Sequence, residues 1–380
     1  MVTIGAVRVA IVTESFLPQV NGVTNSVCRV LEYLAGQGHD ALVVAPGPGP
    51  GSDDHAGQRI RLTPGVALPF YRSFIVGLPT RQVTAVLRDF EPDVVHLAAP
   101  VTLGASGVAA ARRLKVPAVA VFQTDLVGFA RRYGLRGADQ LMWAWLRHVH
   151  EGADRTLVPS RATFEALQRR GVPRLALWAR GVDGRRFHPR HRSAALRARL
   201  SPAGEVLVGY VGRLATEKRV SMLRHLTGIR GMRLVVVGDG PAERRLRRIL
   251  PDAVFTGFRT GQELSELVAS LDVFVHTGAD ETFCQAVQEG LASGVPVVAP
   301  AAGGPLDLVR PGTNGLLYPP DDADALRAAV ETLVADRALR NRLAGEARPS
   351  VRGRDWSNIC AELITHYDAV RSGAPERRAA

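Results

Sequence analysis

Two glutamates in the second half of the chain have a spacing that suits the two ends of an extended polar ligand. Glu281 lies just ahead of a predicted helix and Glu289, eight residues later, lies inside it. Eight residues of helix rise roughly 12 Å, and the free N–H groups at a helix start can bind phosphate. A nucleotide sugar has this layout, with sugar hydroxyls, a diphosphate and ribose hydroxyls in a row. Two solvated surface glutamates are the alternative.

The residues around these glutamates set the limits of the predicted helix. Thr282 and Gln285 have the spacing of a capping box, which predicts a helix start near Phe283. Gly294 is expected to stop the helix, and residues 295–299 are apolar and predict a buried strand.

Two cations follow the strand predicted at residues 206–212. Arg213 offers a planar fork for phosphate oxygens, and Lys218 offers a compact charge. Lys218 is one of only two lysines in a chain with 48 basic residues, which argues against random drift. The two cations predict a diphosphate site that stabilises a leaving group without a metal; solvated surface charges are the alternative.

Asp322 and Asp324 are paired carboxylates that could hold a divalent ion. They directly precede a helical run, however, and helix capping explains carboxylates there. The sequence therefore predicts no metal and no other cofactor.

Polar residues also follow predicted strands in the first half of the chain. The Asn21–Gly22 turn can bring bare backbone near an anion, with an ordinary loop as the alternative. Gln123 can bind hydroxyl groups but cannot titrate near pH 7. Asp125 either orients a hydroxyl group or caps the following segment. His96 is either a site residue or a buried structural histidine.

Strand-like and helix-like segments alternate along the chain, which predicts an α/β protein with parallel sheets. Strands are predicted at 7–12, 41–45, 93–97, 118–122 and 156–159, and then at 206–212, 233–238, 253–256, 273–276 and 295–299. The charged, Pro-bounded segment 190–202 is the expected linker. The predicted domains are 1–190, completed by a last helix at 355–371, and 201–354. Ligands bind beyond the carboxyl ends of such strands, where the candidate residues lie.

Composition narrows the class of protein. The chain has 380 residues, 46% hydrophobic and 22% charged, as expected for two globular domains. No signal peptide or run of 18 apolar residues is evident. Three cysteines without metal spacing predict a reduced, cytoplasmic setting.

The net charge of +12 is concentrated in residues 1–190, which carry 23 basic and 14 acidic residues. No nucleic-acid-binding pattern accompanies this charge. A further hypothesis is peripheral contact with the inner face of an anionic membrane that carries a lipid acceptor. It rests on Arg131, Arg132, Arg136, Trp143 and Trp145; a solvated helix face with core tryptophans is the alternative.

The spacing of Glu281 and Glu289 and the Gly-Arg-Leu…Glu-Lys segment at 212–218 resemble the signature of retaining glycosyltransferases of family 4. The resemblance extends from Val7 to about Tyr367. It implies the GT-B fold: two Rossmann-like domains facing across a cleft, with the C-terminal helix crossing back to the first. It also implies transfer of a hexose from a nucleotide sugar to a hydroxyl acceptor, either a lipid or a small molecule.

The resemblance assigns roles to individual residues. Glu281 would face the donor sugar, Glu289 the ribose, and Arg213 and Lys218 the diphosphate. The predicted catalytic residues are Glu281, Arg213, Lys218 and Asp125. The predicted donor-binding residues are Gly22, Gln123, Arg213, Lys218, Glu281, Phe283, Cys284, Gln285 and Glu289, and the acceptor residues are Asn21, His96 and Asp125.

Two positions depart from the usual family pattern. Cys284 stands where the family has Gly, and Gln123 stands where it commonly has His. The Gln123–Asp125 variant and the Asn21–Thr24 loop resemble the branch described as GDP-mannose-dependent α-mannosyltransferases, which favours mannose as the sugar. A UDP-sugar transferase for glucose or N-acetylglucosamine is the alternative.

Other classes fit less well. A dehydrogenase would need Gly-x-Gly-x-x-Gly after the first strand. A P-loop enzyme would need Gly-Lys, and neither Lys115 nor Lys218 follows a glycine. A nucleotide-sugar epimerase of the same fold is the serious rival, because it differs in acting without an acceptor. A non-catalytic binding protein would not need Arg213, Lys218, Glu281 and Glu289 together.

Overall fold

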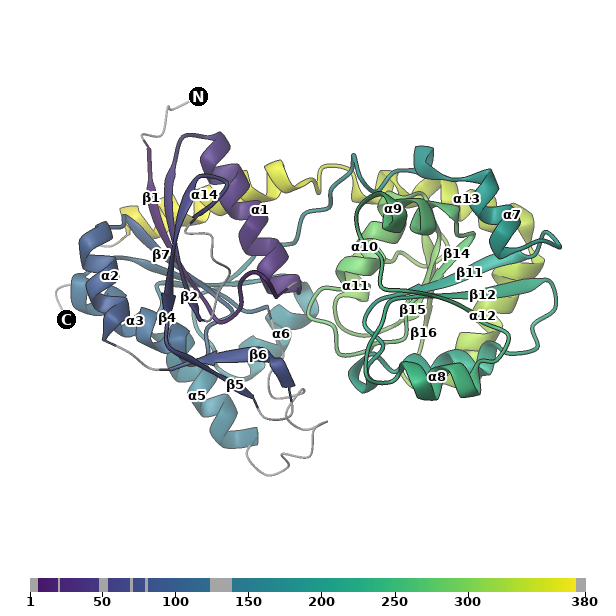
Figure 1. Cartoon of the computed structure of the whole chain (residues 1–380), viewed down its shortest axis with the longest axis horizontal. Helices are drawn as coiled ribbons and strands as arrows, with labels where there is room; N and C mark the ends of the chain where they lie inside the picture. Colours follow the sequence, from purple (N-terminus) through teal and green to yellow (C-terminus); the bar gives the residue numbers. More distant parts are fainter. Residues whose placement is uncertain are drawn as a thin grey trace. The chain divides into compact units, whose positions relative to one another are not determined.

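The architecture has two large β-sheets, each covered by helices, and nearly all strands within each sheet are parallel (Figure 1). The computed structural model describes residues 6–19, 21–47, 54–68, 71–78, 81–123 and 139–373. The described residues up to 180, together with 356–373, form one compact unit, and residues 181–355 form a second. The predicted α/β class is confirmed.

The first unit contains an eight-stranded sheet in the order β10-β9-β8-β7-β1-β2-β4-β3. Neighbouring strands are parallel except β3 and β4. β5 and β6 form a separate antiparallel pair. The elements are β1 (Arg8–Thr13), α1 (Gly22–Gly36), β2 (Asp40–Pro46), β3 (Asp54–His55), β4 (Gln58–Thr63), β5 (Gly65–Leu68), β6 (Tyr71–Gly77), α2 (Gln82–Phe90), β7 (Val94–Ala98), α3 (Leu103–Leu114), β8 (Ala118–Val121), α5 (Asp139–Glu151), β9 (Arg155–Val158), α6 (Arg161–Arg169), β10 (Leu175–Leu177) and α14 (Trp356–Ser372).

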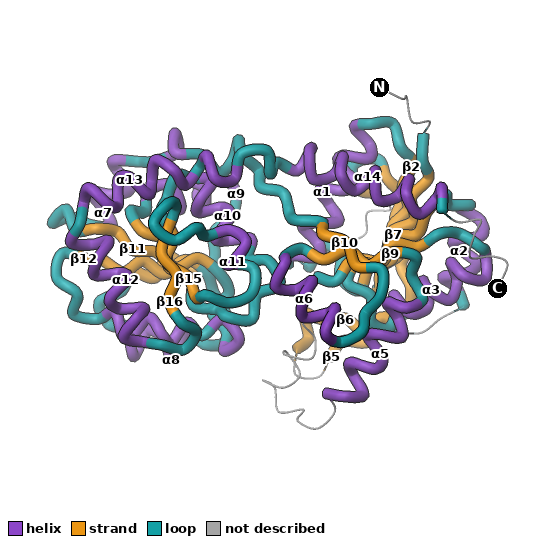
Figure 2. Tube along the Cα trace, turned by 180° about the vertical axis from the view of Figure 1, so that it is seen from behind, coloured by secondary structure: helices purple, strands orange, loops and turns teal. Residues whose placement is uncertain are grey.

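Strand β1 shows why this sheet is covered on both faces. Successive side chains of a strand point to opposite faces. Val9 and Ile11 pack into a core that includes residues of α1 and α14, whereas Ala10 and Val12 pack into a core with residues of α2 and α3. Both faces are therefore buried, which explains the continuous apolar run. α14 lies beside α1 in both views (Figures 1 and 2), so the predicted return of the C-terminal helix is confirmed.

The second unit contains a six-stranded parallel sheet in the order β13-β12-β11-β14-β15-β16. Figure 2 shows its strands in orange, enclosed by helices in purple. The order reverses between β11 and β14, as in doubly wound nucleotide-binding folds. The elements are η1 (Pro189–His191), α7 (Ala194–Leu200), β11 (Val206–Val211), η2 (Thr216–Lys218), η3 (Val220–Leu226), β12 (Met232–Val237), α8 (Glu243–Ile249), β13 (Val254–Gly257), α9 (Gly261–Ser270), β14 (Val273–Val275), α10 (Gln285–Ala292), β15 (Val297–Pro300), α11 (Pro305–Leu308), β16 (Gly315–Tyr318), α12 (Ala323–Ala335), α13 (Arg337–Ala347) and η4 (Pro349–Val351).

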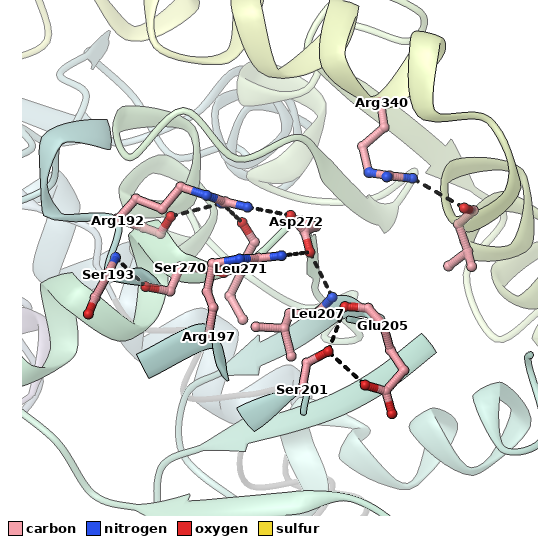
Figure 3. A network of polar contacts seen from close by, with 12 residues as sticks. Arg192, Ser193, Arg197, Ser201, Glu205, Leu207, Ser270, Leu271, Asp272 and Arg340 are labelled. Carbon is pink, nitrogen blue, oxygen red and sulfur yellow. Dashed lines mark hydrogen bonds and ion pairs between the residues drawn. The ribbon is translucent and has the colours of Figure 1, made fainter. Parts of the chain in front are cut away.

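The charged segment at 190–202 is folded onto the second unit (Figure 3). Arg192 and Arg197 donate to the two carboxylate oxygens of Asp272, at 2.5 and 3.0 Å. The Leu207 N–H donates to the same carboxylate at 2.8 Å. Burial opposes ionisation of Asp272, but these donors hold its pKa below the usual range. The basic residues that suggested a linker thus hold η1 and α7 against the second unit. The boundary between the two units lies at residues 180–181.

Candidate active site

The predicted cations and carboxylates converge at the point where the strand order of the second unit reverses. β11 and β14 are neighbours in the sheet, but the segments that follow them run to opposite sides. Arg213 and Lys218 follow β11, whereas His276 and Glu281 follow β14. Ligands of doubly wound sheets bind at such a crevice.

Lys218 and Glu281 are in direct contact. The Lys218 Nζ atom lies 2.6 Å from Glu281 Oε1, and His276 Nε2 lies 3.3 Å from the same oxygen. The Thr277 hydroxyl group donates to the Lys218 carbonyl at 2.7 Å and ties the β14 segment to the β11 segment. The Lys218 side chain keeps 30% exposure, so its ammonium group can also meet a ligand.

Electrostatics keeps this cluster charged. Burial alone would raise the pKa of Glu281, but Lys218 and His276 outweigh it and lower that pKa far below the usual range. Burial would likewise lower the pKa of His276, but Cys284 and Glu281 outweigh it and raise that pKa to about 10. Glu281 is therefore an anion and His276 a cation at neutral pH.

Helix α10 begins two residues later than the sequence predicted. Its N-cap is Cys284, which has a left-handed backbone (φ 77°) and makes no side-chain cap. The capping box of Thr282 and Gln285 was therefore wrong, because the left-handed residue separates Thr282 from the helix. Glu281 lies in irregular backbone, so the 12 Å helical rise does not describe its distance from Glu289. The predicted stop is confirmed, with Gly294 just past the helix at φ 75°.

A glycine pair on another loop holds the segment that carries Glu281. The Gly304 N–H donates to the Glu281 carbonyl at 2.8 Å. A Cβ atom at Gly304 would lie 1.9 Å from the Phe283 carbonyl oxygen, and one at Gly303 would lie 2.5 Å from the Glu281 carbonyl oxygen. The Phe283 side chain itself is buried at 2% exposure, so this predicted donor residue packs in the core of the unit.

Glu289 lies on α10, half-buried, with Arg186 and Gln285 as its electrostatic neighbours. Burial raises its pKa to about 7, although both neighbours lower it. Gln285 also donates to the Gly181 carbonyl at 2.9 Å. Glu289 is therefore a carboxylate whose charge is only partly present at neutral pH.

The resemblance assigns Glu289 to the ribose of the donor, and this assignment predicts that donor affinity depends on pH. Only the ionised carboxylate can accept hydrogen bonds from both ribose hydroxyl groups, and a group with a pKa of about 7 rises from roughly 10% to roughly 90% ionised between pH 6 and pH 8. The Kd for GDP-mannose, measured by calorimetry, should therefore fall by roughly tenfold over this range. GDP-mannose is the right probe because its diphosphate diester does not titrate there. An equal slope in Glu289→Gln would contradict the assignment.

Arg213 is placed by the aromatic core beneath it. The buried Tyr210 hydroxyl group donates to the Arg213 carbonyl at 3.1 Å. The guanidinium Nη1 lies 3.9 Å from Glu217, and the side chain is 34% exposed. Arg213 thus lies just after the end of β11, and its guanidinium group is partly exposed at the surface of the unit.

In the first unit, Arg180 contacts two of the predicted donor-binding residues, Gly22 and Gln123. The Asn21 side chain caps α1 by accepting from the backbone N–H groups of Val23 and Thr24. Arg180 donates to the Gly22 carbonyl at 2.6 Å and to the Gln123 side-chain oxygen. Burial lowers the pKa of Arg180 to about 10. Arg180 was not predicted as a site residue, because nothing in its spacing in the sequence links it to Gly22 or Gln123.

His96 is a structural histidine. It is 1% exposed, and its Nδ1 lies 2.7 Å from the Tyr367 hydroxyl group. Burial lowers its pKa to about 4. Of the two alternatives that the sequence left open, the structure favours the buried one. Asp125, the third predicted acceptor residue, lies outside the described residues.

Two other carboxylates act as caps. Glu14 is buried and accepts from the Val101 and Gly104 N–H groups and the Thr102 hydroxyl group at 2.9–3.1 Å, beside the start of α3. Asp322 accepts from the Ala325 N–H at 2.9 Å as the N-cap of α12. The capping interpretation of Asp322 is therefore confirmed.

Comparison with known proteins identifies both halves of the chain. Residues 20–186 match the model of Glycosyltransferase Family 4, and residues 192–349 match that of Glycosyl transferases group 1. A GDP-mannose-dependent alpha-mannosyltransferase of Mycobacterium tuberculosis is 54% identical, with 96% of this chain and 97% of the relative covered. A Corynebacterium glutamicum protein of the same name is 46% identical, with coverage of 97% and 91%.

Solved structures give the same fold. Anabaena HepE in complex with UDP aligns with a TM-score of 0.78 at 19% identity, covering 95% of this chain and 100% of that one. Sucrose-phosphate synthase from Thermosynechococcus elongatus aligns with a TM-score of 0.77 at 22% identity, covering 96% and 99%. The fold is GT-B, and the resemblance found in the sequence is confirmed. The chain belongs to glycosyltransferase family 4 and is a glycosyltransferase.

Proposed function

We propose that this enzyme transfers mannose from GDP-mannose to a hydroxyl acceptor, with retention of the α configuration and without a metal. The observation that carries the proposal is the contact between Lys218 and Glu281 at the reversal point of the second sheet. A cation for the diphosphate and a carboxylate for the sugar stand side by side there. The bond that is cleaved in a nucleotide sugar joins the sugar to the diphosphate, so in this proposal it lies between the Lys218 ammonium group and the Glu281 carboxylate.

Each charged residue has one task in this proposal. Arg213 and Lys218 bind the diphosphate and stabilise the negative charge that develops on it as the bond breaks. Glu281 accepts hydrogen bonds from hydroxyl groups of the mannose and orients it. Glu289 accepts from the ribose. The departing phosphate oxygen takes the proton of the acceptor hydroxyl group, so no side chain is assigned as a nucleophile.

The identity of the donor is supported by three relatives at 46–54% identity, all named GDP-mannose-dependent alpha-mannosyltransferases. Some more distant relatives are named for other sugars, among them a 2-deoxystreptamine N-acetyl-D-glucosaminyltransferase at 30% identity. GDP-mannose is therefore favoured over UDP sugars.

Calorimetric titration tests the donor. GDP should bind at least roughly five times more tightly than UDP, because each buried polar group left unpaired by the wrong base costs about 1–3 kcal/mol. Excess EDTA should change neither affinity nor turnover. Tighter binding of UDP would overturn the mannosyl assignment, and activity that EDTA abolishes and Mn²⁺ restores would overturn the metal-free assignment.

The acceptor is proposed to be a lipid at the inner face of a membrane, with the enzyme in the cytoplasm. α5 exposes Leu141 at 75% and Trp145 at 44%, next to Val101. Apolar and aromatic side chains of this kind favour the membrane interface. Trp143 instead stacks on Phe122, as in the core alternative. Arg131, Arg132 and Arg136 lie outside the described residues. Among the residues that the structure describes, no helix is long and apolar enough to cross a membrane.

Flotation with anionic liposomes tests this contact. Binding that is lost at high salt supports it, and the absence of binding at low salt would point to a water-soluble acceptor. Trp145→Ser is the variant of choice, because it removes the exposed aromatic ring.

A further inference from the structure

A compact group of metal-binding side chains lies within the second unit. His276, Glu281 and Cys284 each offer one possible ligand atom, and these nitrogen, oxygen and sulfur atoms all lie within 4.8 Å of one another. His276 is 3% exposed, Cys284 is 5% exposed, and the Glu281 side chain is 14% exposed. The set is thus largely shielded from water.

The His276 ring is held in place by a neighbouring ring and by a backbone contact. It stacks on the buried Tyr210 ring, with centroids 6.3 Å apart and planes 10° apart. The Tyr318 hydroxyl group donates to the His276 carbonyl at 3.0 Å. Its Nε2 atom lies 3.3 Å from Glu281 Oε1, and both ring nitrogens are buried, so coordination would replace the contacts that they make with Glu281 and Cys284.

Cys284 completes the set from a strained position. Its backbone is left-handed, at φ 77° and ψ 69°, a conformation that is unfavourable for a residue with a Cβ atom. Glycine would remove this strain. Gly278 keeps the space beside the set open, since a Cβ atom there would lie 3.0 Å from both Glu281 Oε1 and His276 Nε2.

We propose that His276, Glu281 and Cys284 bind one Zn²⁺ ion, and that this ion inhibits the enzyme. Three protein ligands of N, O and S type with a fourth position for water form an open zinc site. Tetrahedral bonds of about 2.0–2.3 Å separate ligand atoms by roughly 3.3–3.8 Å. Two ligand atoms at the upper limit of 4.8 Å would therefore have to approach each other by about 1 Å. Zn²⁺ binds the neutral imidazole and the thiolate, so its binding must displace the proton that His276 carries at neutral pH.

Inhibition follows from the shared Glu281 carboxylate and rests on the proposed function. The Lys218 ammonium group lies 2.6 Å from the same Oε1 atom that would coordinate the ion. A divalent ion repels an ammonium group at this range, so the ion and the Lys218–Glu281 pair exclude each other. The zinc-bound form would therefore lack the pair that is proposed to hold the diphosphate and the sugar.

Cobalt spectroscopy tests the site without any assay of activity. Co²⁺ added to the metal-free protein should give a thiolate-to-cobalt charge-transfer band in the near ultraviolet, and Zn²⁺ should bleach it. The band should vanish in Cys284→Gly, which also relieves the left-handed strain and so should fold. Cys28→Ser, which removes a thiol from the first unit, is the matched control and should keep the band. A wild type without the band, or a Cys284→Gly protein with it, would overturn the site.

Zinc inhibition is tested separately from the site. Zn²⁺ should inhibit the release of GDP from GDP-mannose, in competition with the donor. EDTA should reverse this inhibition. In Cys284→Gly, the zinc concentration for half-inhibition should rise by at least about tenfold, by analogy with the weaker metal binding that follows loss of supporting groups. A normal cobalt band together with zinc-insensitive turnover would overturn the inhibitory role. If the wild-type protein gave a normal cobalt band but no transfer from GDP-mannose in the absence of zinc, the proposed function alone would be wrong.

Discussion

Replacing Lys218 by alanine is expected to lower kcat by roughly 10²–10³-fold, the usual loss when one preorganised electrostatic donor is removed. The ammonium group contacts Glu281 at 2.6 Å and retains access to a ligand. Without it, Glu281 is an uncompensated anion beside the position proposed for an anionic diphosphate. The Kd for the donor should therefore rise as well. Arg213→Ala should lower kcat by a similar factor.

The chain offers a matched control for Lys218. Lys115 is the other lysine, and it lies at the end of α3 in the first unit with a left-handed backbone (φ 57°). Lys115→Asn removes the same charge, and Asn tolerates this backbone. Its steady-state kinetics should match the wild type. If Lys218→Ala and Lys115→Asn had the same kcat, the diphosphate assignment would be lost.

Glu281→Gln is expected to lower kcat by about 10²-fold, because a small misplacement of the reacting sugar has an effect of that size. The variant keeps the volume of the side chain but loses the charge that pairs with Lys218 and His276. Affinity for GDP, which lacks the sugar, should be equal to or tighter than that of the wild type, since Lys218 is released toward the diphosphate. Single-turnover kinetics and calorimetry separate the two effects.

The neighbouring carboxylate provides the control for Glu281. Asp280 lies 3.1 Å from Arg219 and is one-third exposed. Asp280→Asn also removes one negative charge from this segment, so it should change kcat little. A large loss of GDP affinity in Glu281→Gln, with kcat preserved, would mean that Glu281 binds the nucleotide rather than the sugar.

Periodicity and composition were sufficient for most of the architecture. All ten predicted strands are present, with ends shifted by at most two residues. Apolar runs buried on both faces of a sheet are evident in a sequence. The strands that were not predicted are β3, β4, β5, β6, β10 and β16. Three of them have weak patterns: β10 has three residues, β16 has four, and β4 carries arginines at positions 59 and 61.

The site was predictable where chemistry coincides with strand ends. Arg213, Lys218 and Glu281 follow strands that are neighbours in the sheet, and the structure brings Lys218 and Glu281 into contact. The contacts made by Arg180 and Glu14 depend on residues 57–158 positions away, which no local pattern reveals. The late start of α10 was also hidden, because a left-handed cysteine is rare and no propensity predicts it.

The most direct test of the central claim is the product formed from GDP-mannose. Purified enzyme with GDP-mannose and a membrane lipid extract should release GDP and form, in equal amount, a lipid whose new mannose is α-linked by NMR. UDP-glucose in a parallel reaction should give far less product. A β-linked mannose, an epimerised nucleotide sugar without transfer, or a preference for UDP-glucose would contradict retaining transfer from GDP-mannose.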